Sequence, residues 1–418
     1  MAKTAHIAEL HAQAAKLEID GYRKLPREEL IAAIKDAGGD PGAEVVVEAT
    51  IDADDDNGGA VKTDAAGPSD EDAPTVEVSG VLDILPQRYG FLRLNGLEAD
   101  PGDVYVSASQ VRRCELRSGD EVAGPAREPR RGERHRALVH IDQVNGAEPP
   151  LPERPAFEEL PAIAPERRLP LDGEGADVLA RAVDLLAPLA LGQRVLVRAA
   201  PRSGRTTLLR GIANAIAATE GVELIVLLVD ERPEEATAWR EAVPGAQFAI
   251  ATAEMAPDDQ LRLADLALAR ARRHAETGGD AVLLVDSLSR LDYAAGDVAA
   301  VKSLFGAGRN LAGGGSLTIV GTTLIDASDE GAAERAVGTT ESAVITLDAE
   351  LAAVGVHPAI VAAECRISNE ESLRGDEELE AVRKLRAALA ALGPTEAAAY
   401  LRERIEASPS NAELLKSL

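Results

Sequence analysis

The sequence predicts a multidomain protein in which a small helical module and a small β-barrel precede a larger α/β domain with a mainly parallel sheet. The chain has 418 residues, of which 45% are hydrophobic, and this is enough for two or three domains with sizeable cores. Short alternating strands fill residues 78–144, and longer runs of Val, Ile and Leu alternate with helical segments after residue 171. Continuous apolar strands between helices are typical of a parallel sheet that is covered on both faces.

The first 77 residues predict a helical module followed by a linker. Residues 5–37 carry apolar side chains at helical spacing, and Gly38 and Gly39 end this pattern. From 40 to 77 the composition changes to Asp, Glu, Gly, Ala and Pro, with Lys62 as the single basic residue. Such a segment predicts a disordered, self-repelling linker. A plain spacer and an acidic decoy near an RNA site both stay open as its role.

Charge and composition limit the possible partners. The net charge of −27 opposes non-specific attraction to polyanions, so any nucleic-acid binding must come from a local site. The two cysteines, Cys114 and Cys365, form no C-x-x-C pair, and neither a disulfide framework nor a zinc site is expected. No apolar run approaches the roughly 18 residues of a membrane helix, and the N-terminus has no signal-peptide pattern. We therefore expect a cytoplasmic protein without membrane contact.

The segment 78–148 predicts a β-barrel. Five short strands separated by Gly, Pro and Asp suit the OB-type barrel in number and spacing. Alternation along two neighbouring strands can bring Tyr89, Phe91 and Tyr105 to one face, beside Arg93. Exposed rings next to a cation make a stacking platform for single-stranded bases. The alternative, that the three rings are core residues of a small barrel, stays open at this point.

A strand, a turn and a helix at residues 193–216 form the central motif of the α/β domain. A phosphate loop needs a glycine at close approach to the phosphates, a cation, and a hydroxyl for Mg²⁺. Gly204 and Thr206 supply the first and the last of these. Arg205 stands where the pattern expects Lys, and Ala199 where it expects the first Gly. Because the motif fails twice, a nucleotide loop and an ordinary strand-to-helix turn both remain possible.

Two other strands of this domain end in carboxylates. VLLVDS ends at Asp286, and ELIVLLVDERPEE ends at Asp230 and Glu231. In an open α/β sheet, ligands bind at the carboxyl ends of the strands. One carboxylate there suits the orientation of Mg²⁺, and another suits the polarisation of an attacking water. Together with the turn before Thr206, these strand ends predict a site for a nucleoside triphosphate.

These motifs together resemble the bacterial transcription termination factor Rho family. The phosphate loop, DERPEE, VLLVDSLSRL, FGAGRN with GGGSLTIVGTTLID, and VHPAI are similar to the RecA-like ATPase core of that family. GVLDILPQRYGFLR, DVYVSASQVRR and GERHRALVHIDQVN are similar to its cold-shock-type RNA-binding domain. The resemblance implies an N-terminal helical domain at 1–39, an acidic linker at 40–77, an OB-fold domain at 78–148, a connector at 149–171, and an ATPase core with C-terminal helices at 172–418.

The resemblance also implies roles for individual residues. RNA binding falls to Tyr89, Phe91, Arg93, Tyr105, Glu133 and His135, the last in place of the usual Tyr. ATP binding falls to Arg202, Ser203, Gly204, Arg205, Thr206 and Thr207, with His357 where the family has an adenine-stacking Phe. Mg²⁺ is expected to be held by Thr206 and Asp286. The catalytic residues are expected to be Glu231, Asp286 and Arg232. The implied partners are single-stranded, pyrimidine-rich nascent RNA, the RNA polymerase transcription complex, and further subunits of a hexameric ring.

Departures from the family pattern predict slow or absent hydrolysis. The planar guanidinium of Arg205 does not reproduce the compact ammonium that reaches the β- and γ-phosphates. The two arginine-finger positions of the family correspond to Gly355 and to a position near Ser368. Unless the nearby Arg366 takes the place of a finger, the rate of hydrolysis should fall by a factor of the order of 10³ or more.

Two further departures concern RNA translocation. The segment 292–304 is far shorter than the corresponding central-hole loop of the family, and the segment 326–336 lacks the lysine-bearing sequence of the second loop. Three hypotheses follow. The chain is a working, RNA-stimulated Rho helicase and hydrolase, a degenerate paralogue that regulates or joins a true Rho, or an OB-fold RNA-binding protein whose α/β part is only a scaffold. Whether it is an enzyme stays open at this stage.

Overall fold

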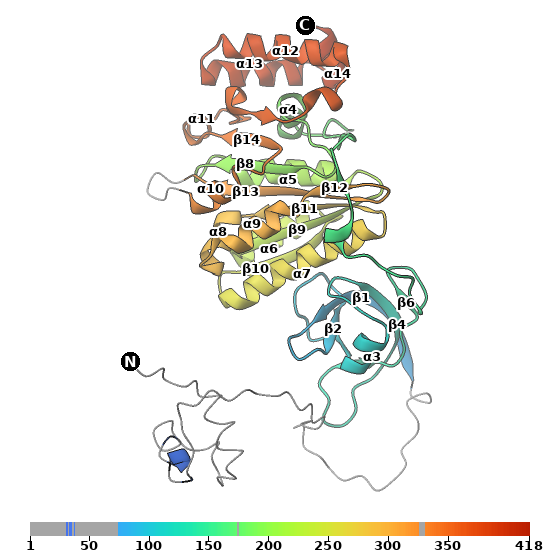
Figure 1. Cartoon of the computed structure of the whole chain (residues 1–418). Helices are drawn as coiled ribbons and strands as arrows, with labels where there is room; N and C mark the ends of the chain where they lie inside the picture. Colours follow the sequence, from blue (N-terminus) through green and yellow to red (C-terminus); the bar gives the residue numbers. More distant parts are fainter. Residues whose placement is uncertain (1–30, 32, 36, 38–73, 174, 326–330) are drawn as a thin grey trace. The chain divides into compact units, whose positions relative to one another are not determined.

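The structure, a computed structural model, describes residues 31, 33–35, 37, 74–173, 175–325 and 331–418. The chain divides into two compact units, residues 1–67 and 68–418. The predicted helical module, except for five of its residues, and the linker up to residue 73 lie outside the described part. The second unit contains a β-barrel and an α/β domain (Figure 1).

The barrel is a six-stranded sheet in the order β1-β2-β3-β5-β4-β6, and the pairing of β1 with β4 closes it. Its core is aliphatic and includes Leu82, Leu92 and Val104. Gly124 on β4 has no room for a side chain, because a Cβ there would lie 2.3 Å from the carbonyl oxygen of His140. The elements are β1 (Thr75–Ile84), β2 (Gly90–Arg93), β3 (Val104–Val106), α3 (Ala108–Arg113), β4 (Glu121–Arg127), β5 (Arg136–Leu138) and β6 (Gln143–Val144).

Two details of the barrel differ from the sequence prediction. The first strand begins at Thr75, so the last three residues of the predicted linker belong to the sheet. The segment expected as a fifth strand, residues 136–144, is divided into β5 and β6, and both pair with β4. The close approach of His140 to Gly124 lies between them and accounts for this interruption.

The α/β domain is built on a sheet in the order β10-β9-β11-β13-β8-β14-β15, with β12 and β7 at one side. The first six strands pair in parallel. These are β8 (Arg194–Ala199), β9 (Val222–Glu231), β10 (Gln247–Thr252), β11 (Asp280–Asp286), β13 (Ser316–Leu324) and β14 (Ala343–Leu347); the antiparallel additions are β7 (Ala162–Ile163), β12 (Arg309–Leu311) and β15 (Arg366–Ile367).

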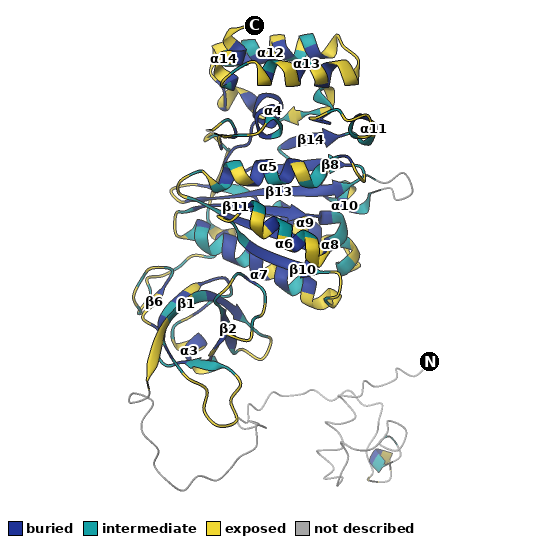
Figure 2. Ribbon diagram, turned by 180° about the vertical axis from the view of Figure 1, so that it is seen from behind, coloured by how far each residue is buried: buried dark blue, intermediate teal, exposed yellow. Residues whose placement is uncertain are grey.

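Successive residues of the central strands pack into two different cores. On β11, Val282 and Leu284 belong to one hydrophobic cluster, and Leu283 and Val285 belong to the other. Period-two alternation between two apolar faces requires helices on both sides of the sheet. Figure 2 shows these strands as buried along their length. The predicted fold class, a mainly parallel sheet covered on both faces behind a small barrel, is therefore confirmed.

Helices cover both faces of this sheet. Helix α5 contributes Leu208 and Leu209 to one of the two clusters, and α7 contributes Ala267 and Ala271 to the other. The helices are α4 (Val178–Leu186), α5 (Arg205–Ala217), α6 (Pro233–Ala242), α7 (Pro257–Glu276), α8 (Leu288–Ala295), α9 (Val298–Gly306), α10 (Ala332–Val337), α11 (Ala349–Ala353), α12 (Asp376–Ala390), α13 (Pro394–Glu406) and α14 (Asn411–Lys416). In the described part of the chain, none of the helices has the length and apolar character to cross a membrane.

The predicted connector at 149–171 is more than a spacer. Its strand β7 pairs with β12 and so extends the sheet of the α/β domain. Phe157 is fully buried, and the guanidinium of Arg309 lies 4.9 Å from the centre of its ring. The connector therefore packs as part of the core.

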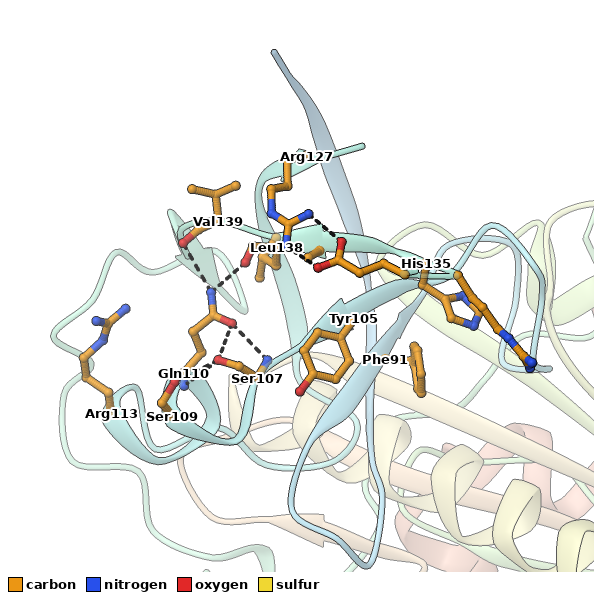
Figure 3. Close-up of a pocket in the computed structure, with 13 residues that line it drawn as sticks. Phe91, Tyr105, Ser107, Ser109, Gln110, Arg113, Arg127, His135, Leu138 and Val139 are labelled. Atoms are coloured by element: carbon orange, nitrogen blue, oxygen red, sulfur yellow. Dashed lines mark hydrogen bonds and ion pairs between the residues drawn. The ribbon is translucent and has the colours of Figure 1, made fainter. Parts of the chain in front are cut away.

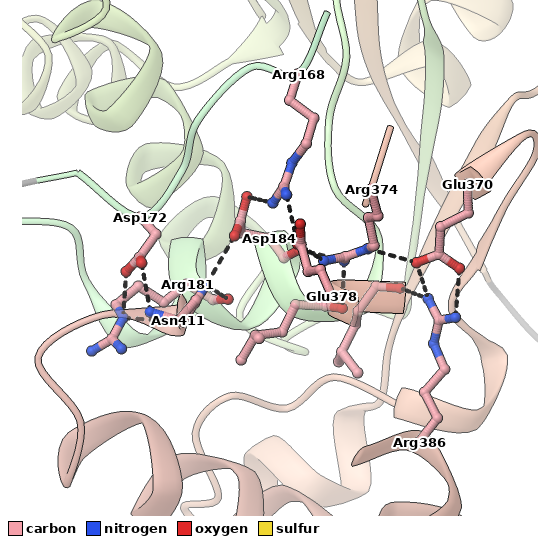
Figure 4. A network of polar contacts seen from close by, with 11 residues as sticks. Arg168, Asp172, Arg181, Asp184, Glu370, Arg374, Glu378, Arg386 and Asn411 are labelled. Atoms are coloured by element: carbon pink, nitrogen blue, oxygen red, sulfur yellow. Dashed lines mark hydrogen bonds and ion pairs between the residues drawn. The ribbon is translucent and has the colours of Figure 1, made fainter. Parts of the chain in front are cut away.

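Buried hydrogen bonds join the C-terminal segment to α4 (Figure 4). The side chain of Arg374 is fully buried, and it pairs with Glu370 and Glu378. It also donates to the carbonyl oxygens of Asp184 and Leu185, at 2.8 and 2.9 Å. A buried guanidinium is tolerated only when its donors are satisfied, so this network fixes where α12 packs.

Replacement of Leu209 by Ala should destabilise the α/β domain. Leu209 on α5 is fully buried in the same cluster as Trp239, the single tryptophan of the chain. The cavity left behind should lower the free energy of unfolding by about 2–5 kcal/mol. Urea unfolding followed by tryptophan fluorescence measures this change. Asn214→Ala, on the exposed side of the same helix, should stay within about 0.5 kcal/mol of the wild type; equal effects of the two substitutions would contradict the assignment of the core.

Candidate functional site

The turn between β8 and α5 has the backbone of a phosphate loop. Gly204 caps α5 with φ of 86°, a left-handed conformation that favours glycine. Arg202 also has positive φ, 63°. Thr206 lies in the first turn of the helix, where the backbone N–H groups have no partner within the helix and point outward. This geometry presents donors to an anion in front of α5.

Asp286 ends β11 beside this turn and is fully buried. Its Oδ1 accepts a hydrogen bond from the hydroxyl of Thr322 at 3.0 Å, and Nε of Arg205 lies 3.1 Å from the same oxygen. Because Nε is not aligned for a hydrogen bond, this second contact is an ion pair only. Burial raises the pKa of Asp286, while the charges of Arg205 and Arg290 act in the opposite direction. Arg205, the cation of the loop, is therefore paired with the buried carboxylate of Asp286.

Glu231 ends the neighbouring strand β9 and is held in an ion pair. Its Oε2 lies 2.9 Å from Nη1 of Arg290, which comes from α8. Its Oε1 accepts a hydrogen bond from the backbone N–H of Arg232 at 3.1 Å. Glu231 is also close enough to Asp286 to raise the pKa of that group. The two carboxylates at the strand ends therefore belong to one cluster.

The structure brings some of the predicted nucleotide residues together. Arg205, Asp286 and Glu231 form the cluster, and Arg290 joins it, although no role was predicted for Arg290. Its position in the sequence could have indicated a role, because Arg290 follows Asp286 by four residues within the motif VLLVDSLSRL. The other predicted residues surround the loop or are exposed: Ser203 is buried, Thr206 is half-buried, and Arg202, Thr207, Arg232 and His357 are exposed.

The residues present fit an Mg²⁺ ion that arrives with a triphosphate. Oδ2 of Asp286 is a buried oxygen without a hydrogen-bond partner, and Thr206 offers a hydroxyl on the first turn of α5. Such ions are usually held by one or two protein oxygens, waters and the phosphates. Within the described ranges, no three His, Cys, Asp or Glu side chains gather to form a metal cage.

Four rings cluster on the barrel surface. Phe91 on β2 faces Tyr105 on β3 in the sheet register, with ring centres 6.1 Å apart. Tyr89 lies 5.5 Å from Tyr105, and His135 lies 4.9 Å from Phe91. None of them belongs to the aliphatic barrel core, and Tyr105 is 36% exposed. Of the two interpretations that the sequence left open, this placement favours the stacking platform.

A cavity of about 520 Å³ opens beside these rings (Figure 3). Phe91, Tyr105 and His135 line it, together with Arg113 and Arg134. Glu133 is also at its border and receives two hydrogen bonds from Arg127, at 2.6 and 2.9 Å. These bonds are the main reason why the pKa of Glu133 is lowered to about 2. The cavity thus offers aromatic faces, guanidinium groups and one ionised carboxylate.

Arg93 lies on the other side of the rings, between two carboxylates. Its Nη2 pairs with Asp83, and its Nη1 lies 2.5 Å from Oδ2 of Asp103. Nε of Arg93 and Oδ1 of Asp103 are buried without hydrogen-bond partners. The two carboxylates therefore hold the guanidinium of Arg93 in place beside the ring of Phe91.

Comparisons with known proteins agree with this architecture. The family models that match are Rho termination factor, N-terminal domain at residues 3–42; Rho termination factor, RNA-binding domain at 78–150; and ATP synthase alpha/beta family, nucleotide-binding domain at 180–305. Transcription termination factor Rho of Chromobacterium violaceum is 33% identical over all of this chain and 98% of the relative. The chain belongs to the Rho family.

Other relatives have the same name. Rho of Aquifex aeolicus is 37% identical over 83% of this chain and 86% of the relative. Rho of Streptomyces lividans is 39% identical over 82% of this chain, but the match spans only 52% of that longer relative. Among solved structures, a prototypical ATPase from the type III secretion system of pathogenic bacteria aligns with a TM-score of 0.50 at 20% identity, covering 60% of this chain and 78% of its own. That last likeness supports the fold of the α/β domain.

The matched segments contain the clusters described above. The nucleotide-binding family model covers the phosphate loop, Glu231 and Asp286, and the RNA-binding model covers the four rings and Arg93. This member of the Rho family therefore has an RNA-binding domain and a nucleotide-binding domain of the ATP synthase type.

Replacement of Asp286 by Asn should increase stability at neutral pH. The folded-state pKa of Asp286 is raised, so the charged carboxylate disfavours the folded state at pH values above that pKa. An uncharged Asn of the same shape removes this cost and keeps an oxygen for Thr322. The advantage should shrink as the pH falls to about 4 and below, where the wild-type carboxyl is protonated in the folded state and increasingly in the unfolded state.

The measurement is the midpoint of thermal unfolding of both proteins at several pH values. Asp230→Asn, at an exposed position near the end of the neighbouring strand β9, serves as the control and should show no such pH-dependent gain. A destabilised Asp286→Asn protein at neutral pH would mean that the ion pair with Arg205 outweighs the cost of burial.

Proposed function

We propose that this chain is a Rho-type transcription termination factor that binds single-stranded nascent RNA with its barrel and ATP with its core, and that its hydrolysis and translocation are weakened. The observation that carries the proposal is the ion pair between Arg205 and the buried Asp286. It places the cation of the phosphate loop on a carboxylate instead of leaving it free for the phosphates.

The ion pair affects both functions of the loop. Thr206 and Asp286 would hold Mg²⁺, which neutralises phosphate charge when it is bound. With Nε of Arg205 at Oδ1, that carboxylate already has a counter-charge. A guanidinium is planar and bulkier than an ammonium, so it follows the β- and γ-phosphates less closely than a lysine would. Binding of ATP is compatible with this arrangement, whereas rapid turnover is not.

The proposed catalytic carboxylate is restrained as well. Both oxygens of Glu231 accept hydrogen bonds, one from Arg290 and one from the backbone of Arg232. These contacts hold the carboxylate in place, so an attacking water has to compete with them for its oxygens. Activation would require Arg290 to move toward the phosphates.

The remaining family features are absent or changed at their expected positions. Gly355 has no side chain, Ser368 is exposed, and Arg366 on β15 is the nearby exposed cation. Without an arginine finger, the charge of the transition state is not neutralised, which costs about 10³-fold or more in rate.

The segment expected to grip RNA in the central hole is short. Helix α8 ends at Ala295 and α9 begins at Val298, so only two residues join them. Of the second segment, 326–336, the first five residues lie outside the described part of the chain. These features support weakened translocation along RNA.

The second candidate is a non-hydrolysing paralogue that regulates a true Rho or joins it in a mixed ring. The joint change of Arg205, both finger positions and the central-hole segment favours it over a fully active helicase. Either candidate would act in the cytoplasm on the RNA polymerase transcription complex, alone as a homohexamer or within a mixed hexamer. The match to a nucleotide-binding family model weighs against a plain scaffold role for the core.

The purified protein should bind poly(C) RNA and release little phosphate from ATP, with or without that RNA. Binding is measured by fluorescence anisotropy, and hydrolysis by phosphate release. Phe91→Ala serves as the control for specific binding and should weaken RNA affinity by about 1–3 kcal/mol, the value of one stacked base. Brisk RNA-stimulated turnover would refute weakened hydrolysis, and absence of RNA binding would refute the role of the barrel.

Arg205→Lys alone should not restore hydrolysis. The lysine returns the compact charge to the loop, but the finger positions remain Gly355 and Ser368. Phosphate release is compared with that of the wild type and of Arg210→Lys, a substitution on the same helix at a residue paired with Glu235. Recovery of RNA-stimulated turnover in Arg205→Lys would show that an unidentified residue supplies the finger.

A further inference from the structure

An arginine of the α/β domain reaches the RNA-binding side of the barrel. Nη2 of Arg262, on α7, lies 2.7 Å from Oδ2 of Asp83 on β1. Asp83 is only 5% exposed, and the same oxygen also accepts Nη2 of Arg93, a residue of the proposed RNA site. Both residues lie within the compact unit 68–418. One buried carboxylate thus connects a helix of the core with the RNA site.

Arg262 also borders a second cavity beside the rings. This cavity has a volume of about 350 Å³, and its lining includes Arg93, Asp103 and Arg262. Phe91 and His135 line both this cavity and the larger one, so the two adjoin along these rings. A strand of RNA that stacks on Phe91 therefore passes within reach of Arg262.

Of the two arginines that line the second cavity, Arg262 is the one exposed enough to meet a phosphate. Arg93 is nearly buried and is shared between Asp83 and Asp103, so its charge is already balanced. The side chain of Arg262 is 38% exposed, and its recorded contact uses one of five N–H donors. Asp83 holds the guanidinium through Nη2, while the side chain keeps exposed surface and lines the cavity.

We propose that Arg262 is an RNA-backbone contact that the nucleotide-binding core supplies to the barrel. The proposal rests on the proposed RNA binding by the barrel. RNA that stacks on Phe91 and His135 places a phosphate against the free edge of Arg262. In a chain with a net charge of −27, a single cation at this position matters, because the field of the whole molecule opposes RNA.

The consequence is a physical link between RNA and the nucleotide site. Helix α7 packs its apolar side, including Ala267 and Ala271, in the same cluster as Leu283 and Val285 of β11. That strand ends at Asp286. RNA held by Arg262 is therefore attached to α7, the helix that packs against the strand ending in Asp286.

The experiment is a salt titration of RNA binding with matched variants. The probe is a fluorescein-labelled oligocytidine RNA of about ten nucleotides, within the site sizes of OB folds. Arg262→Gln removes the charge while Asp83 keeps Arg93 as its partner. The slope of log affinity against log salt should decrease by about 0.7, the value for one phosphate contact on a single strand, and affinity near 0.1 M salt should fall roughly fivefold. Arg262→Lys keeps the charge and should keep most of the slope.

Arg240→Gln is the control for a purely structural role. Arg240 on α6 also joins the core to the barrel through one ion pair, with Glu98 at 2.8 Å, but it does not line this cavity. Its replacement should leave the salt slope unchanged. Thermal unfolding midpoints of all variants show whether they are folded.

The outcomes distinguish this proposal from the function on which it rests. Wild-type protein that fails to bind the oligocytidine refutes RNA binding by the barrel. Wild-type protein that binds, together with an Arg262→Gln variant of unchanged salt slope, refutes the contact of Arg262 alone. Equal losses in Arg262→Gln and Arg240→Gln with unchanged slopes would reduce Arg262 to a residue that only holds the two domains together.

Discussion

The nucleotide site depends on how one carboxylate is kept inside the sheet. Asp286 ends a strand that lies between two parallel neighbours, and both faces of that sheet are covered, so its side chain has no exposed surface. A charge in such a position needs a counter-charge and hydrogen bonds, because its desolvation costs several kcal/mol. Thr322 and Arg205 supply them. The loop in front of α5 is therefore held against β11 by the same contact that occupies its cation.

The RNA side of the molecule follows a different principle. The barrel is stabilised by aliphatic residues, and the chain keeps several of its few aromatic rings on the surface. Exposed rings contribute little to folding, but they offer flat faces for bases. The acidic groups nearby are neutralised by arginines, Glu133 by Arg127, and Asp83 by Arg93 and Arg262. Local pairing of this kind lets a strongly acidic chain present a surface that does not repel RNA.

The sequence predicted the features that arise from local patterns. Runs of Val, Ile and Leu located the parallel strands, and acidic residues after such runs located Asp286 and Glu231 at one edge of the sheet. Contacts between distant segments were missed. Arg290 is 59 residues from its partner Glu231, and Arg262 is 179 residues from Asp83. No periodicity links such pairs, since the fold alone brings them together. The pairing of β7 with β12, inside an expected connector, was missed for the same reason.

Arginine occurs both where the fold of this protein is stabilised and where the protein is proposed to bind nucleotide and RNA. A guanidinium with several fixed donors suits a carboxylate or carbonyl group that does not move, as Arg374 shows among the C-terminal helices. The same property at position 205 favours a lasting contact with Asp286 over one that follows a departing phosphate. At position 262, it would favour the proposed contact with an RNA phosphate that stays in place. Interactions of this type agree with the proposed function, in which RNA and nucleotide are bound while translocation is weakened.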